Sequence, residues 1–171
     1  MPDPDQRRID DPIAQLLELT RALEEACASL KTAAGGAWPS IVELLDRQLP
    51  RYRQDLEQSL IPLLKRRLRN DEDDEEQALA RELFLLSKQL EDLAASWPRV
   101  RVLLEAGTPV ATVAQYAQDW EDHLDTMDSR IIPALSARLG RCDLDLLGQA
   151  MARHRGLDWQ AIAACDPDDL R

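Results

Sequence analysis

The chain has 171 residues, of which 44% are hydrophobic and only 4% aromatic, and its formal net charge at pH 7 is -11. The length predicts a single domain over residues 1–171, and the abundance of leucine, alanine and charged residues favours helices over strands. The acidity excludes generic binding of nucleic acids and of anionic membranes, because both partners would be repelled.

The first predicted helix starts at Asp11-Pro12, since proline is favoured at an early helical position, and Gly35-Gly36 ends it. Apolar residues recur along one face of this helix, with a threonine in the same stripe. The stripe is Leu16, Thr20, Leu23, Cys27 and Leu30. Such spacing is typical of a helix that buries one side.

The second predicted helix opens at Trp38-Pro39-Ser40 and ends in the basic run from Lys65 to Arg69. Its inward stripe is Leu45, Leu49, Tyr52, Leu56, Leu60 and Leu63. The acidic run from Asp71 to Glu76 then begins the third helix. Basic residues at the end of one helix and acidic residues at the start of the next each suit the helix dipole, so two solvated helix ends explain these consecutive charged runs. The third helix extends to about Leu104, with Pro98 expected to kink it.

A fourth helix follows the break at Gly107-Thr108-Pro109. Its inward face carries Val113, Tyr116, Trp120, His123, Met127, Ile131 and Ala134. Pro62 and Pro133 are each expected to kink or end a helix near its carboxyl end. After Gly140, an amphipathic segment and a last turn predict a helical cap over about 143–165 at one end of the bundle.

The two halves of the chain repeat each other. The segment from Leu16 to Leu30 is echoed by the segment from Leu83 to Trp97. In the same way, Tyr52 followed by Ile61-Pro62 is echoed by His123 followed by Ile132-Pro133. The sequence therefore predicts two helical hairpins in tandem, which make an all-α, up-down-up-down four-helix bundle over about 11–139 with a short carboxy-terminal helical extension.

The predicted stripes place six residues in one interior layer. They are Thr20, Tyr52, Leu56, Ser87, His123 and Met127. Helix bundles use such a layer to hold metals through glutamate and histidine side chains. Here, however, the neutral hydroxyls are poor metal ligands, leucine cannot bind a metal, and the thioether of methionine is a soft ligand suited to copper or haem. Only His123 is therefore a good ligand for iron or zinc.

Several segments, in this order and spacing, resemble the bacterial hemerythrin-like proteins, the HHE cation-binding family. They are Arg21 to Cys27, Leu49-Pro50-Arg51, Ile61 to Leu64, Tyr116 to Pro133 and Leu147 to Gly156. The resemblance covers roughly Asp11 to Gly156. It implies a four-helix bundle in which histidines, with one His-x-x-x-Glu motif on each of helices two and four, bind two irons that carry oxygen or sense oxygen and redox state.

The resemblance also assigns the ligand positions of this chain. The family's histidines on helices one and three fall on Thr20 and Ser87, and its helix-four pair falls on His123 and Met127. The helix-two pair falls on Tyr52 and Leu56. Bacterial members of the family often have two adjacent histidines at this point, and matching the second of them would place the pair on Arg53 and Glu57. Five of the six principal positions have lost the ligand, and the whole chain contains only two histidines, His123 and His154.

We therefore expect a repacked core without a di-iron site or any other cofactor. In this interpretation His123 forms a hydrogen bond to Tyr52, Thr20 or Ser87 in place of iron. Met127 and Trp120 are expected to pack in the core, and Cys27 to be a buried apolar residue. His154 is expected at the surface.

Three functional hypotheses remain at the level of sequence. No catalytic motif is present, so the first is a non-enzymatic binding, regulatory or scaffold module for an unknown protein or small-molecule partner. The second is an iron- or zinc-binding oxygen or redox sensor with a reduced site around His123, completed by Glu57, Asp128 or Asp55, although these carboxylates belong more naturally on helix flanks. The third is an apolar ligand cavity between Leu56, Met127 and Trp120.

The compartment is predicted from what the sequence lacks. No apolar run approaches membrane-spanning length. The cysteines Cys27, Cys142 and Cys165 are widely spaced and form no Cys-x-x-Cys pair, so neither a disulfide framework nor a zinc knuckle is indicated. We expect a cytoplasmic protein with reduced thiols.

Overall fold

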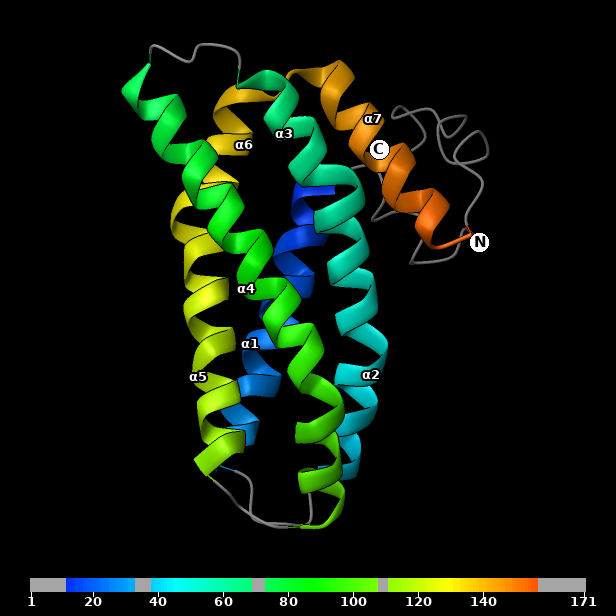
Figure 1. Cartoon of the computed structure of the whole chain (residues 1–171). Helices are drawn as coiled ribbons and strands as arrows, with labels where there is room; N and C mark the ends of the chain where they lie inside the picture. The colour runs from blue at the N-terminus through cyan, green and yellow to red at the C-terminus, as the bar shows by residue number, and fades with distance from the viewer. Residues whose placement is uncertain (1–11, 33–37, 69–72, 108–110, 157–171) are drawn as a thin grey trace.

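A computed structural model describes residues 12–32, 38–68, 73–107 and 111–156, and every regular element within these ranges is a helix (Figure 1). The all-α prediction is therefore confirmed. In the described ranges, no helix combines the length and the apolar character that crossing a membrane would need. The predicted stop at Gly35-Gly36 and the predicted turn around Trp159 lie outside the described residues.

Seven α-helices and two π-helical turns are found in these ranges. They are α1 (Pro12–Thr32), α2 (Trp38–Gln54), η1 (Asp55–Leu60), α3 (Ile61–Arg67), α4 (Asp74–Glu105), α5 (Ala111–Thr126), η2 (Met127–Ile131), α6 (Ile132–Arg138) and α7 (Arg141–His154). The second predicted helix corresponds to α2, η1 and α3 in direct succession, and the fourth to α5, η2 and α6. Pro98 lies inside α4, which continues to Glu105.

The long helices pack side by side (Figure 1). Helix α1 contacts α2 and α5, and α4 contacts the same two helices. Helix α7 contacts η1 and α1 and lies against the outside of the other helices, toward the end that α3 and α6 form (Figure 1). The predicted extension therefore lies along the flank of the bundle near that end.

The predicted apolar stripes form the core. All the stripe residues predicted on α1, on α2 with its continuation, and on α5 with η2 are buried, and Ala134 on α6 is half-buried. Helix α1 buries a wider face than α4, since Leu19 and Thr20 are both buried on α1, whereas on α4 Leu86 is buried and Ser87 is only half-buried. The reason is that α7 covers α1 in addition to α2 and α5.

The two π-helical turns have a common cause in the sequence. Proline has no backbone N–H, and its ring clashes with the carbonyl four residues earlier. Just before Pro62 the Ile61 N–H bonds to the Leu56 carbonyl, five residues back, and just before Pro133 the Ile132 N–H bonds to the Met127 carbonyl. Each proline was expected to kink or end its helix. Neither proline ends its helix, because each helix forms a π-helical turn before the proline and then continues as α3 or α6.

Candidate functional site

The interior layer predicted from the stripes is centred on Tyr52 from α2 and His123 from α5. Their side chains are fully buried. Thr20 from α1, Leu56 from η1 and Met127 from η2 are also fully buried. The two π-helical turns begin within four residues of Tyr52 and His123, so the repeat in the sequence brings matching positions to the same region of the interior.

Tyr52 and His123 form a buried hydrogen bond, with 3.0 Å between Tyr52 Oη and His123 Nε2. This confirms the prediction that His123 bonds within the layer and identifies Tyr52 as its partner. Burial lowers the pKa of His123 from 6.5 to about 4 and raises the pKa of Tyr52 well above 10, so both groups are neutral near pH 7.

The direction of this bond follows from the donors available. A neutral imidazole has one N–H donor and one acceptor nitrogen, and His123 Nδ1 has no partner among the described residues. If Nε2 carried the hydrogen, the phenol O–H would lose its acceptor and Nδ1 would remain an unused acceptor. We infer that the Tyr52 O–H donates to Nε2, because this arrangement leaves fewer buried polar atoms unpaired.

The other hydroxyls of the predicted layer do not join this bond. Thr20 Oγ1 donates to the Leu16 carbonyl one turn earlier, at 2.8 Å. The prediction that Ser87 faces inward is wrong, because Ser87 is half-buried and lines a surface hollow between α4 and the helix formed by η1 and α3. Leu86 takes the inward position.

Aromatic rings surround the hydrogen bond. The indole of Trp120 packs edge to face against Tyr52, with ring centroids 5.8 Å apart, and against His123, at 5.4 Å. Tyr116 also contacts Trp120, with ring centroids 6.4 Å apart, and stacks on Trp97 of α4 at 5.9 Å. The predicted core role of Trp120 and Met127 is confirmed by their burial.

The carboxylates considered as partners of His123 lie elsewhere. Glu57 is half-buried and accepts a 2.9 Å hydrogen bond from Arg53 one turn away, and Asp128 is exposed. Asp55 is buried but is bonded to the carboxyl end of α7. Within the described ranges, no group of three or more His, Cys, Asp or Glu side chains could hold a metal ion.

These residues do not fit the metal that the family resemblance implies. His123 Nε2 is already bonded to Tyr52, and the two glutamate positions of the family are filled by the fully buried side chains of Leu56 and Met127. Thr20 Oγ1 is bonded to its own helix. His123 Nδ1 has no partner among the described residues, but it carries the hydrogen in the inferred tautomer, and a single nitrogen is too few for an iron or zinc site.

Two predictions about charged residues are wrong. His154 was expected at the surface and Asp55 on a helix flank. The Asp55 side chain is 1% exposed, lies 3.3 Å from His154 Nδ1 and accepts a 2.7 Å hydrogen bond from Arg155 Nη2. This cluster holds the end of α7 against η1, and the pair of Arg67 with Asp143 holds its beginning.

The cysteine and cavity expectations have different outcomes. Cys27 is buried, as predicted, and its burial raises its pKa to about 12, which keeps the thiol protonated.

The three residues of the predicted apolar cavity, Leu56, Met127 and Trp120, pack in the core. Two hollows lined by described residues lie between α2 and α4, of about 540 and about 520 Å³, and none of these three side chains lines either of them.

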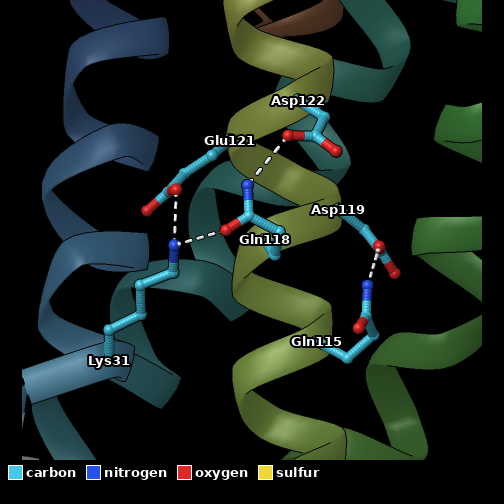
Figure 2. Close-up of polar contacts among 6 residues, drawn as sticks. All are labelled: Lys31, Gln115, Gln118, Asp119, Glu121 and Asp122. Carbon is cyan, nitrogen blue, oxygen red and sulfur yellow. Dashed lines mark hydrogen bonds and ion pairs between the residues drawn. The ribbon is translucent and has the colours of Figure 1, made fainter.

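Three acidic residues of α5, Asp119, Glu121 and Asp122, make polar contacts on its surface (Figure 2). Lys31 of α1 donates to Glu121 at 2.5 Å and to Gln118 at 2.9 Å. The amides of Gln115 and Gln118 donate to Asp119 and Asp122, each four residues further along. This network joins α1 to α5 at the surface and engages these carboxylates there.

Comparison of the chain with protein-family models, with curated proteins and with solved structures gave no match. The likeness to hemerythrin-like proteins therefore depends on the residues and spacings of this sequence.

Proposed function

We propose that this chain is a degenerate bacterial hemerythrin-like protein of the HHE family. In this proposal it is an up-down-up-down four-helix bundle that has lost its di-iron site. It acts in the cytoplasm as a non-enzymatic binding, regulatory or scaffold module for a protein or small-molecule partner.

The observation that carries this proposal is the hydrogen bond between Tyr52 and His123. A di-iron layer needs several histidines and carboxylates that point inward, and their loss would leave unpaired polar groups if nothing replaced them. Here a phenol satisfies the one remaining histidine at Nε2, and Leu56 and Met127 add apolar contact to the layer. These substitutions are what conversion of a metal layer into a packed core requires.

A binding role is also favoured by part of the surface. Phe84 and Leu85, neighbours on α4, are 65% and 59% exposed. Phe84 also lines a surface hollow between α4 and the helix formed by η1 and α3, which places a large apolar side chain where a partner can contact it. Among the described residues, the hydroxyl of Tyr52 is paired with a base, His123, but both side chains are fully buried, which is why we propose a role without catalysis.

Metal content tests the proposal most directly. Protein expressed with added iron is purified as the wild type, His123→Ala and His154→Ala, and its iron and zinc are measured by elemental analysis. We expect far less than one metal per chain in all three proteins. We also expect the melting temperature of the wild type to be insensitive to chelator and to added metal, because nothing binds the native state selectively.

The competing hypothesis, an iron- or zinc-binding oxygen or redox sensor around His123, predicts the opposite result. Near-stoichiometric metal in the wild type and in His154→Ala, with loss in His123→Ala, would overturn the proposal. His154→Ala is the matched control because it removes the other histidine, which contacts Asp55 and not Tyr52.

A further inference from the structure

The aromatic residues of this chain are few, yet a continuous row of them runs through the described core. The row contains both tyrosines and two of the four tryptophans of the sequence. Its order is Trp97, Tyr116, Trp120 and Tyr52, with successive ring centroids 5.9, 6.4 and 5.8 Å apart. Electron transfer falls steeply with distance, and rings in contact at this spacing exchange electrons efficiently.

The two ends of the row differ in access and in partners. Trp97 is 9% exposed, lines the hollow of about 520 Å³ between α2 and α4, and donates from Nε1 to Asp46 Oδ1 at 2.8 Å. The other oxygen of the same carboxylate, Asp46 Oδ2, is paired with Arg101 at 3.1 Å, so this end of the row is polar and reaches the surface. Tyr52, at the other end, is fully buried and bonded to His123.

The hydrogen bond to His123 sets Tyr52 apart from the other tyrosine. A phenol that loses an electron becomes a very strong acid, so its oxidation is easiest where a base can take the proton. His123 Nε2 lies 3.0 Å from Tyr52 Oη. Tyr116 Oη has no such acceptor among the described residues, and the neighbouring Trp120 offers only an N–H donor.

We propose that Tyr52 is a redox-active tyrosine that loses one electron along the aromatic row and one proton to His123. An outer-sphere one-electron oxidant at the Trp97 hollow accepts an electron from Trp97 and is reduced by one electron. The electron deficiency then moves from Trp97 to Trp120 across Tyr116, whose ring bridges the two indoles without itself being oxidised, and from Trp120 to Tyr52. There the phenol O–H bond breaks, a new N–H bond forms at His123 Nε2, and a neutral tyrosyl radical remains beside an imidazolium.

The surroundings favour this step and protect its product. Burial lowers the pKa of His123 to about 4, so the imidazole is neutral at pH 7 and free to accept a proton, and it remains a far stronger base than an oxidised phenol. Full burial of Tyr52 excludes water and bulky reductants from the radical. The redox step goes beyond the proposed function, since a packed core needs the hydrogen bond between Tyr52 and His123 but no electron transfer.

Photo-oxidation with a tris-bipyridyl ruthenium complex, quenched by persulfate, tests the proposal on the full chain. Electron paramagnetic resonance records the radical that remains after illumination. We expect a tyrosyl signal in the wild type, loss of this signal in Tyr52→Phe, and retention of its line shape in the matched control Tyr116→Phe. We expect Trp97→Phe to slow the appearance of the signal. Near-ultraviolet circular dichroism establishes that each variant is folded.

A second measurement uses the wild type alone and does not depend on how the variants fold. Pulsed electron paramagnetic resonance of the radical in deuterium oxide detects an exchangeable deuteron that is hydrogen-bonded to the phenoxyl oxygen. We expect one such deuteron, on His123 Nε2. Ring-deuterated tyrosine narrows the signal if the radical is a tyrosyl. A radical that survives in Tyr52→Phe, resides on Tyr116 or lacks the coupled deuteron would overturn the proposal.

Discussion

The two histidines of this chain are stabilised in opposite ways. His123 lies at the centre of the bundle and makes one neutral hydrogen bond to Tyr52 among aromatic rings. His154 lies where α7 meets η1, and with Arg155 it contacts the buried carboxylate of Asp55. The first site contains no charged group near pH 7, whereas the second contains at least a carboxylate and a guanidinium.

The difference shows what each location permits. A neutral pair needs only its own hydrogen bond to be tolerated in an apolar interior. Charges lose much more hydration when buried, and their attraction often only offsets this loss. The charged cluster lies at a boundary between elements, where Arg155 is partly exposed, although Arg155 Nη1 is buried without a partner among the described residues.

The largest expected effect comes from removing the ring that encloses the neutral pair. Trp120 is 1% exposed and contacts Tyr52, His123 and Tyr116, so Trp120→Ala leaves a large cavity. We expect the free energy of unfolding to fall by about 3–5 kcal/mol in urea denaturation. The exposed Phe84→Ala is the control, with a change within about 0.5 kcal/mol. A small effect of Trp120→Ala would contradict the tight packing of the layer.

Acidification tests whether His123 is buried in its neutral form. Its pKa is lowered from 6.5 to about 4, so the unfolded chain binds the proton more tightly, and stability is lost as the pH falls from about 6.5 through 4. The shift corresponds to roughly 3 kcal/mol.

The readout is the difference between the wild type and His123→Leu, because other groups titrate in the same range. Burial raises the pKa of Asp55, and it also raises the pKa of Asp128, so these groups act in the opposite direction. We expect the wild type to lose stability more steeply than the variant below pH 6.5 in urea titrations at each pH. Parallel profiles would show that His123 is not buried neutral.

Removing the phenol hydroxyl measures the neutral hydrogen bond itself. Tyr52→Phe keeps the ring but leaves His123 Nε2 without a partner, and we expect a loss of about 1–3 kcal/mol. His123→Leu leaves the Tyr52 hydroxyl unpaired in the same way. The double variant is expected to lose less than the sum of the two single losses, because both partners are then absent. Strict additivity in this cycle would contradict the hydrogen bond.

The interior layer around Tyr52 and His123 could be predicted from sequence because it follows from helical spacing and from the internal repeat. Helical spacing identified the inward faces, and the repeat placed Tyr52 and His123 at matching positions. The same spacing failed at Ser87, since the two echoed segments bury faces of different width and the face of α1 is wider because α7 covers it. Sequence similarity between two helices does not show how many neighbours each one has.

The charged cluster was missed for a different reason. Asp55 and His154 are 99 residues apart, and their contact depends on where α7 docks. Four residues of the π-helical turn, Asp55, Leu56, Ser59 and Leu60, are buried together, so the buried face here is wider than the predicted stripe through Leu56 and Leu60. One signal was present, since the apolar stripe of α7 through Leu147 and Met151 continues to the basic residues at its end.

The smallest expected effect distinguishes the two sites most clearly. Burial raises the pKa of Asp55 even though Arg155 and His154 lower it, so the folded state disfavours the ionised carboxylate relative to the unfolded chain. Asp55→Asn keeps the shape without the charge. We expect it to be neutral or to stabilise the protein by less than about 1 kcal/mol at pH 7, in contrast to Tyr52→Phe.

The pH dependence of the stability of Asp55→Asn tests a second time whether the ionised Asp55 carboxylate destabilises the folded protein. The unfavourable contribution of ionised Asp55 is present above its raised pKa in the folded state and disappears as the pH falls toward 3.8. Any stability gained in the variant is therefore expected to vanish in acid, as measured by urea denaturation at each pH. A loss of several kcal/mol at pH 7 would instead mean that the attraction of Arg155 and His154 outweighs the lost hydration. Both histidine sites would then stabilise the fold.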